Sequence, residues 1–206
     1  RHSSFPNAVA VIDELSQRSR IDARGDRLSR ALFATDASIY QIIPDGVVFP
    51  RTIEDIQAAV RACAKHGVPL TARGAGTGLA GGAVNRGLIL DCSRYMNRIL
   101  SIDPQSRTAV VEPGVVLDEL NAAAAPHGLH FAPDVATSSR ATLGGMIANN
   151  SCGAHSVMYG RTVDHVVALD VVLADGSRAS WGEMTNYELR ITKEESPPPF
   201  VIRHSS

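Results

Sequence analysis

Ten consecutive residues, Arg73 to Gly82, read R-G-A-G-T-G-L-A-G-G, and five of them are glycine. A β-type apolar run lies on either side of this stretch, which we call the glycine loop. Glycine adopts positive φ angles without strain and lets backbone amides converge on a bound phosphate. No side chain between Gly74 and Gly82 can act as an acid or a base. The glycine loop is therefore predicted to hold the diphosphate of a cofactor rather than to perform a reaction.

Two common phosphate-binding motifs do not explain the loop. Residues Gly76 to Gly81 match G-x-G-x-x-G, but a Rossmann site needs a helix to begin inside the motif, and here a β run begins at Leu88. A Walker A motif is excluded because Gly82 and Ala83 follow Gly81, where Lys and then Ser or Thr are required. One alternative stays open, a flexible surface loop that binds nothing.

The residues before the loop predict helices and then a β-α-β unit. A helical stripe of Val9, Ile12 and Leu15, and a second short helix around residues 28–32, form a helical lead-in over residues 1–39. A β run over 47–49, a helix from Thr52 to His66 and a β run over 68–72 then predict a small parallel pair of strands. The glycine loop would follow the second strand, at the ligand-binding edge of such units.

The residues after the loop predict mostly antiparallel structure. The expected elements are β runs over 88–91, 98–103 and 108–112, a helix over 116–125, and a hairpin of 166–173 with 177–181. The fold class is therefore α+β, with a small parallel β-α-β subdomain at about 46–92 and a mixed or antiparallel subdomain at about 93–182. Residues 183–206 are expected to be an irregular tail, because three prolines interrupt them.

Composition excludes several classes of partner. The chain of 206 residues has a formal net charge of −1 and no run of five like charges, which argues against nucleic acid. No apolar stretch approaches the roughly 20 residues that span a bilayer, so no transmembrane segment is expected. Three cysteines without C-x-x-C spacing favour neither disulfides nor structural zinc, and they fit a reducing, cytoplasmic compartment.

A second polar segment, residues 133–161, is rich in Ser, Thr, Asn and Gly around an apolar stretch at 143–148. Its hydroxyl and amide groups suit hydrogen bonds to a polar ligand, and its glycines permit close backbone approach. The alternative is a long loop whose side chains satisfy its own backbone. Four histidines, His127, His130, His155 and His165, have no metal-ligand spacing and are interpreted as surface or turn residues. Cys152 is expected to be small and buried.

Four motifs in order across residues 40–182 resemble the FAD-binding domain of the vanillyl-alcohol oxidase and p-cresol methylhydroxylase flavoprotein family. They are the glycine loop, V-E-P-G-V at 111–115, P-D-V-A-T-S-S-R-A-T-L-G-G-M-I-A-N-N-S-C-G at 133–153, and Y-G followed by L-A-D-G. The similar branch contains FAD-linked glycolate oxidases, D-lactate dehydrogenases and D-2-hydroxyglutarate dehydrogenases. The resemblance implies the p-cresol-methylhydroxylase-type fold, in which FAD lies between two α+β subdomains of a domain at 40–182.

The resemblance also implies which residues bind FAD. Around the diphosphate it places Gly74, Ala75, Gly76, Thr77, Gly78 and Leu79, with Gly82 beside them, while Arg73 either pairs with phosphate or bridges strands. Around the rest of FAD it places Pro133, Asp134, Ser138, Thr142, Gly144, Gly145, Ala148, Asn149, Ser151 and Gly153. Relatives that link FAD covalently usually carry a histidine in the glycine loop. Here Gly76, Thr77 and Gly78 occupy the candidate positions, so FAD is expected to bind non-covalently.

The function implied is oxidation of a D-2-hydroxy acid such as lactate, glycolate or 2-hydroxyglutarate, with electrons passed on to an acceptor. The rival functions are a reductase of the enolpyruvyl sugar nucleotide type and a non-catalytic FAD-binding module. No catalytic residue and no metal ligand is identified. The substrate domain is not recognisable after Gly182, so the chain is expected to be part of a larger enzyme. An iron–sulfur module, if one is used, would lie outside it, and membrane association would occur through such an electron-transfer partner.

Overall fold

The structure is a computed structural model that describes residues 5–182 and 200–203. These residues form two compact units. Of the described residues, the first unit comprises 5–96 and 172–178, and the second comprises 97–171, 179–182 and 200–203. The described lead-in residues thus belong to the same unit as the glycine loop. The domain limits expected from the sequence stay a prediction.

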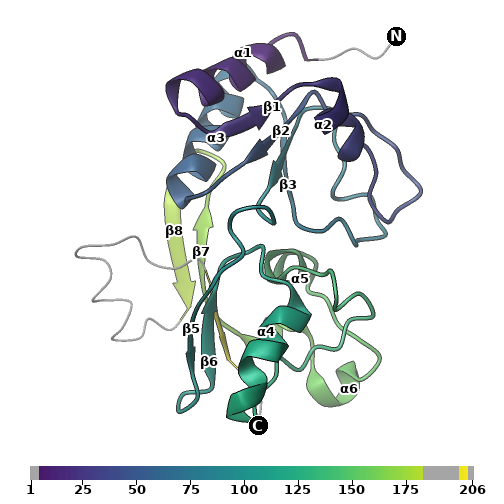
Figure 1. Ribbon diagram of the computed structural model, residues 1–206, viewed down its shortest axis with the longest axis vertical. Coiled ribbons are helices and arrows are strands. Elements are labelled where there is room, and N and C mark those ends of the chain that lie inside the picture. The colour runs from purple at the N-terminus through teal and green to yellow at the C-terminus, as the bar shows by residue number, and fades with distance from the viewer. Residues whose placement is uncertain (1–4, 183–199, 204–206) are drawn as a thin grey trace, which may run out of the picture. The chain divides into compact units, whose positions relative to one another are not determined.

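A four-stranded sheet in the order β1-β2-β4-β3 is the centre of the first unit (Figure 1). Its strands are β1 (Asp22–Arg24), β2 (Gly46–Phe49), β3 (Leu70–Arg73) and β4 (Leu88–Asp91). Strand β4 is parallel to both β2 and β3, and β1 is antiparallel to β2.

Two sequence predictions about this sheet are wrong. Strands β2 and β3 do not pair directly, because β4 lies between them, and β4 is not one of the antiparallel strands. Every residue of β4 is buried, as in a central parallel strand that is covered on both faces. The crossover from β3 to β4 therefore contains the whole glycine loop.

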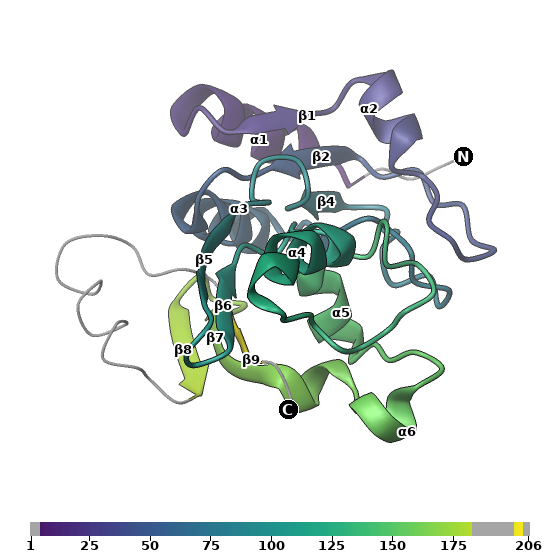
Figure 2. The same cartoon turned by 60° about the horizontal axis from the view of Figure 1, so that its bottom comes forward.

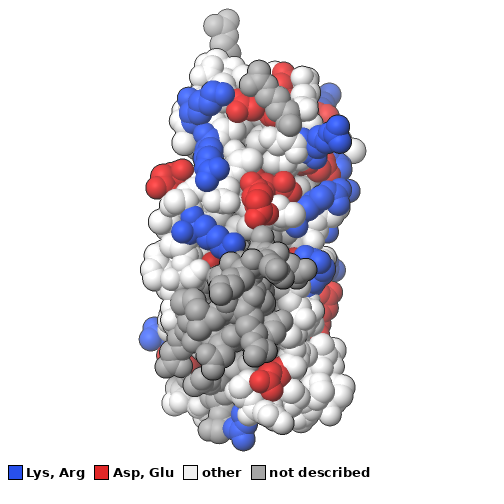
Figure 3. All heavy atoms as spheres, turned by 90° about the vertical axis from the view of Figure 1, so that its left-hand side faces the viewer, with Lys and Arg blue, Asp and Glu red and all other residues white. Residues whose placement is uncertain are grey.

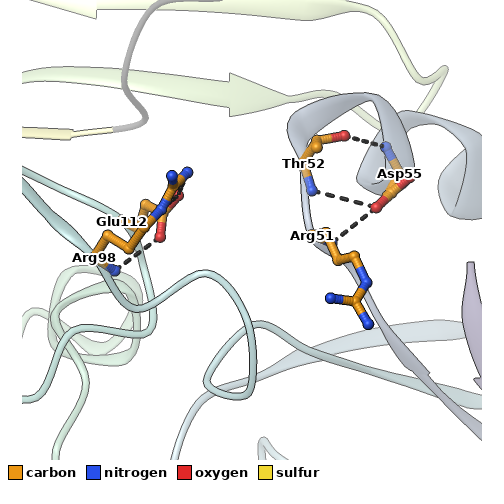
Figure 4. Close-up of polar contacts among 5 residues, drawn as sticks. All are labelled: Arg51, Thr52, Asp55, Arg98 and Glu112. Atoms are coloured by element: carbon orange, nitrogen blue, oxygen red, sulfur yellow. Dashed lines mark hydrogen bonds and ion pairs between the residues drawn. The ribbon is translucent and has the colours of Figure 1, made fainter.

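Helix α3 (Ile53–His66) joins β2 to β3 and is capped at both ends as the sequence predicts. Thr52 and Asp55 form a capping box, shown in Figure 4, and Gly67 ends the helix with a φ of 66°. Its buried face, which includes Ala59 and Cys63, packs with apolar residues of the lead-in and of the sheet in the largest core cluster.

The lead-in helices exist, but their buried faces differ from the prediction. Helix α1 (Ala8–Asp13) continues into a π-helical turn (Glu14–Arg18), and the buried residues are Ala8, Val11 and Leu15, while Val9 is exposed. Helix α2 (Arg27–Leu32) begins at the capping residue Asp26 and exposes both of its leucines. The spacing of apolar residues identified the helices without identifying which side meets the core.

A second sheet, in the order β5-β6-β9-β7-β8, belongs to the second unit. Its strands are β5 (Ile99–Asp103), β6 (Thr108–Val111), β7 (Val166–Val172), β8 (Arg178–Gly182) and β9 (Phe200–Arg203). The predicted pairing of β5 with β6 is confirmed as antiparallel, and β7 and β8 form the predicted hairpin.

Strand β9 corrects the expectation of an irregular tail. It pairs antiparallel with both β6 and β7, because its apolar residues follow the prolines and can join a sheet. The rest of the predicted tail, residues 183–199 and 204–206, lies outside the described residues.

Helices α4 (Leu117–Ala124) and α5 (Leu143–Asn149) lie side by side in the second unit (Figure 2). Helix α4 continues into a 3₁₀ turn (Ala125–His127), and α6 (Ser156–Tyr159) and a further 3₁₀ turn (Thr162–His165) follow α5. Leu143 and Met146 of α5 are buried with Leu117 and Leu120 of α4. Helix α5 was not predicted, because two glycines and an asparagine mask its short apolar face.

Charged side chains of both signs are interspersed on the face shown in Figure 3. Glu112, which follows β6, is an exception because it is buried and only 3% exposed. Its carboxylate accepts hydrogen bonds from the backbone N–H of Arg98 at 2.8 Å and from Nη2 of the same residue at 2.6 Å (Figure 4). Among the described residues, no helix has both the length and the apolar character needed to cross a membrane.

The first sheet makes a testable prediction at its central strand. Leu88→Ala should lower the free energy of unfolding by about 2–5 kcal/mol, because Leu88 is fully buried and its truncation leaves a cavity. Chemical denaturation measures this change. Leu28→Ala is the matched control, since Leu28 is 70% exposed and should shift stability by no more than about 0.5 kcal/mol. Equal effects of the two substitutions would contradict the assigned core.

Candidate functional site

The glycine loop leaves β3 at Arg73 and returns to the sheet before β4. No backbone N–H from Gly74 to Gly82 donates a hydrogen bond to a described residue. Several residues of this run, Ala75, Gly78, Leu79 and Gly82 among them, are exposed, so their amides face solvent. These N–H groups are therefore available to an anionic ligand.

The guanidinium of Arg73 connects Thr35, which precedes the glycine loop, with Ala83, which follows it. Its Nη2 donates to the carbonyl oxygen of Thr35 at 2.8 Å, and its Nη1 donates to that of Ala83 at 3.1 Å. The guanidinium also lies 5.2 Å from the ring centroid of Phe33. Burial lowers the pKa of this guanidinium below its usual value. These contacts join two non-strand segments, and the choice between pairing with phosphate and bridging strands stays a prediction.

Two glycines of the loop rest on side chains and could not carry a Cβ. Gly76 has a φ of +70°, and a Cβ there would lie 2.6 Å from Nη2 of Arg73. Gly81 has a φ of +77°, and a Cβ there would lie 2.5 Å from the ring of Tyr40. By contrast, a Cβ on Gly78 or Gly82 would meet nothing within 4 Å. The protein around Gly78 and Gly82 therefore does not require glycine at either position.

Sequence reasoning missed the segment Thr35–Tyr40, which contacts the loop. The N–H of Ala37 donates to the carbonyl of Gly76 at 2.9 Å, and the N–H of Ala83 donates to Oδ2 of Asp36 at 3.4 Å. The available signal was D-A-S at 36–38, an Asx turn in which Asp36 accepts the N–H of Ser38 at 2.9 Å. That signal predicts a turn without predicting what the turn contacts.

The second polar segment is fixed by a backbone interlock in the second unit. The N–H of Leu143 donates to the carbonyl of Val115 at 2.8 Å, and that of Gly144 donates to Pro113 at 2.9 Å. A Cβ on Gly144 would lie 2.7 Å from Cβ of Pro113, so this close approach requires glycine. The interlock joins the V-E-P-G-V motif to the A-T-L-G-G motif. It also positions Thr142, the residue that precedes helix α5.

Thr142 carries one of two buried side-chain polar atoms that have no hydrogen-bond partner among the described residues. The residue is 3% exposed, and its Oγ1 is the orphaned atom. An unpaired buried hydroxyl costs stability, so such a group is often kept for a ligand.

Asp134 and Gly153 meet at the other end of this segment. A Cβ on Gly153 would lie 2.1 Å from the carbonyl oxygen of Asp134, which again only glycine permits. The carboxylate of Asp134 accepts a short hydrogen bond from Nδ1 of His155 and a longer one from its backbone N–H. The bond from the His155 ring is the main cause that lowers the pKa of Asp134 below its usual range.

The remaining predicted residues occupy the same two regions. The carbonyl of Ser138 accepts the N–H of Asp118 at 3.2 Å, and the carbonyl of Ser151 accepts Oγ1 of Thr162 at 2.6 Å. Asn149 donates from Nδ2 to the carbonyl of Gly145 at 2.9 Å. The predicted residues that are exposed are Ala75, Gly78, Leu79, Gly82, Ala148 and Asn149, while Pro133 is buried.

The histidine and cysteine predictions need two corrections. His165 is only 2% exposed, because its ring packs on Phe131 at 5.4 Å and its Nε2 donates to the carbonyl of Tyr159 at 2.6 Å. Cys152 is exposed rather than buried, since it follows helix α5 in a polar turn. Burial raises the pKa of Cys63 to about 11 and that of Cys92 to about 12. The described residues contain no group of three or more potential metal ligands.

Comparison with known proteins agrees with this arrangement. A family model described as an FAD binding domain matches residues 44–180. D-2-hydroxyglutarate dehydrogenase of Escherichia coli (strain K12) is 44% identical over 182 residues, which cover 84% of this chain and 18% of that protein. Glycolate oxidase subunit GlcD of Bacillus subtilis (strain 168) is 40% identical over 150 residues, 71% of this chain and 32% of that protein. The chain thus spans less than a third of the length of these relatives.

The fold also matches solved structures. A structure of p-cresol methylhydroxylase with bound substrate superposes with a TM-score of 0.73 at 21% sequence identity. The match covers 98% of this chain and 43% of that chain. The p-cresol-methylhydroxylase-type fold expected from the sequence is therefore confirmed.

The Asp134–His155 hydrogen bond predicts a pH dependence of stability. Because the pKa of Asp134 is lowered in the folded state, its contribution is complete above the unfolded value of about 3.9 and is lost as pH falls through the folded value. The difference in melting temperature between wild type and Asp134→Asn should therefore shrink as the pH falls below about 4. Circular dichroism melts measure it. In a His155→Ala background the same substitution should lose this dependence, and an unchanged dependence would contradict the assignment.

Proposed function

Because the chain belongs to the FAD-binding domain family, we propose that it binds FAD non-covalently and serves an enzyme that oxidises a D-2-hydroxy acid. FAD is the cofactor of this domain family. The non-covalent attachment, the substrate class and the roles of individual residues are parts of the proposal.

The free amides of the glycine loop are the observation that supports this function most strongly. Among the described residues, none accepts a hydrogen bond from the N–H groups of Gly74 to Gly82, and Gly78 and Gly82 leave room for a ligand above bare backbone. A diphosphate is an anion that such groups can bind. In the second unit by itself, the orphaned Oγ1 of Thr142 is suited to a polar group of a ligand. The glycine loop therefore fits the diphosphate of FAD.

Bound FAD would supply the redox chemistry by accepting a hydride equivalent from the α-carbon of the hydroxy acid. The chain's own residues would bind FAD and orient it. The loop amides would donate hydrogen bonds to the diphosphate. Thr142 and the neighbouring polar residues of 133–153 would hydrogen-bond a polar ligand group in the second unit. The group that accepts the hydroxyl proton is not assigned to any described residue.

The substrate class rests on the relatives. Two proteins that are 40% or more identical to this chain are named for D-2-hydroxyglutarate and glycolate, both 2-hydroxy acids. The same comparisons favour this function over the reductase alternative. An electron acceptor outside the described residues would then reoxidise the flavin, and an iron–sulfur module is one candidate. A reducing cytoplasmic compartment fits the three free cysteines.

A non-catalytic FAD-binding module is the second candidate. It is favoured by the family match over residues 44–180, which is to an FAD binding domain. Both candidates require FAD binding, and only the first requires that a hydroxy acid bleach the flavin under anaerobic conditions.

Gly78→Ala tests the loop as a binding site for FAD. The substitution should weaken FAD binding by roughly tenfold or more, because the added methyl group occupies the space in which a phosphate approaches the backbone. Titration at micromolar FAD, followed by flavin fluorescence, measures the affinity.

The melting temperature of FAD-free Gly78→Ala should stay unchanged, since the methyl group meets no protein atom within 4 Å. Gly76→Ala is the matched contrast and should lower the melting temperature, because its φ is +70° and Arg73 lies beneath it. Failure of the wild-type protein to bind micromolar FAD would refute the proposal.

Attachment of the flavin is tested by denaturing the FAD-loaded protein and filtering it. All of the flavin should pass through the filter, because the glycine loop contains no histidine that could form a covalent link. The absorbance of filtrate and retentate measures the partition. Flavin retained on the polypeptide after denaturation would show that the attachment is covalent.

A further inference from the structure

We propose that Arg73 and the segment Phe33–Tyr40 form a brace that sets the shape of the glycine loop before FAD arrives. The family model begins at residue 44, so this segment lies outside the matched domain. The inference rests on the proposed function, since it concerns the loop that would bind the diphosphate. Arg73 is then a positioning residue and not a ligand of the phosphates.

The first support is the way in which the guanidinium of Arg73 is used. It donates to Thr35 in the segment and to Ala83 just past the loop, and it stacks on Phe33. A planar guanidinium presents separate N–H donors to two carbonyls while its face lies on a ring, whereas an ammonium is a compact charge without this planar fork. Arg73 is the first residue of the loop and Ala83 follows its last, so this bridge closes the base of the loop.

The second support is a set of contacts from the segment to the loop itself. Ala37 donates to the carbonyl of Gly76 at 2.9 Å, and the carboxylate of Asp36 accepts the N–H of Ala83 at 3.4 Å. The ring of Tyr40 lies against Gly81, where a Cβ would approach it to 2.5 Å. Within the loop these contacts use the carbonyl of Gly76 and the bare Cα of Gly81, and the one backbone donor among them belongs to Ala83, which follows the loop.

The brace therefore restrains the loop without using its donors. No N–H group from Gly74 to Gly82 donates to another described residue, so hydrogen bonds from these donors do not fix the conformation of the loop. Restraint from outside leaves the same amides available to a ligand. A preorganised loop of this kind loses less conformational entropy when a ligand binds.

Arg73→Lys and Arg73→Gln separate a brace from a phosphate ligand. Both variants should weaken FAD binding by about tenfold or more, because neither bridges the two carbonyls as the guanidinium does. If Arg73 paired with phosphate instead, Lys would keep most of the affinity as a point charge and only Gln would lose it. The dependence of FAD affinity on salt should also be the same in wild type and Arg73→Gln, whereas a direct ion pair would make it smaller in the variant.

A second measurement needs no FAD. Nitrogen-15 relaxation of the loop amides in FAD-free protein should show rigid backbone in wild type and increased motion in Arg73→Lys. Tyr40→Ala should also increase motion near Gly81, and it is safe for the fold because Tyr40 is 52% exposed. Arg94→Lys is the matched control, since Arg94 also stacks on an aromatic ring but has no contact with the loop.

The outcomes are distinct. Unchanged loop motion in both Arg73→Lys and Tyr40→Ala, with melting temperatures like that of the control, would overturn the brace. Full FAD affinity in Arg73→Lys would overturn it as well. If wild-type protein bound no FAD, the proposed function would fail, while the relaxation measurement would still decide whether the brace exists.

Discussion

Unpaired backbone donors in the glycine loop are the constraint on which the first unit depends. A chain segment normally fixes its shape by hydrogen bonds among its own N–H and C=O groups, and ordering each residue costs about 1–2 kcal/mol of conformational entropy. From Gly74 to Gly82 the amides contribute no such bond. The shape must then be imposed by neighbours, and the parallel strands β3 and β4 do this by fixing both ends of the crossover.

The second unit differs from the first in which of its groups lack a hydrogen-bond partner among the described residues. There the backbone of the polar segment is largely paired, through the interlock of Pro113 and Val115 with Leu143 and Gly144 and through helix α5. What stays unpaired is a side-chain atom, Oγ1 of Thr142. The glycine loop thus offers backbone donors, and the second polar segment offers a hydroxyl group. Each group is available because other contacts around it stabilise the fold.

Local chemistry made part of this structure predictable. The helix predicted from Thr52 to His66 depends on residue types within a few positions of each other, and it was found with its cap at Thr52 and its end at His66. The glycine loop was located for the same reason, and two of its glycines, Gly76 and Gly81, have positive φ angles. The family membership of the chain followed from motifs in order, and the family model that matches residues 44–180 confirmed it.

Long-range pairing was harder to predict. Nothing in the run Leu88–Asp91 says that it inserts between two earlier strands, and β9 follows prolines that suggested an irregular tail. The contact of Asp36 and Tyr40 with the loop joins residues about 40 positions apart, beyond the reach of any local pattern. Buried His165 was missed because a neighbouring carbonyl and a ring, rather than its own sequence context, determine its burial.

The interlock in the second unit has a consequence for how such chains diverge. Its hydrogen bonds join backbone to backbone, and the only side-chain requirement is the absence of a Cβ at Gly144. Substitutions at most other positions of the two motifs leave these backbone hydrogen bonds intact. The interlock therefore restricts the residue type at few positions. Backbone hydrogen bonds of this kind place few demands on side chains, and the fold of the chain superposes on that of p-cresol methylhydroxylase at 21% identity.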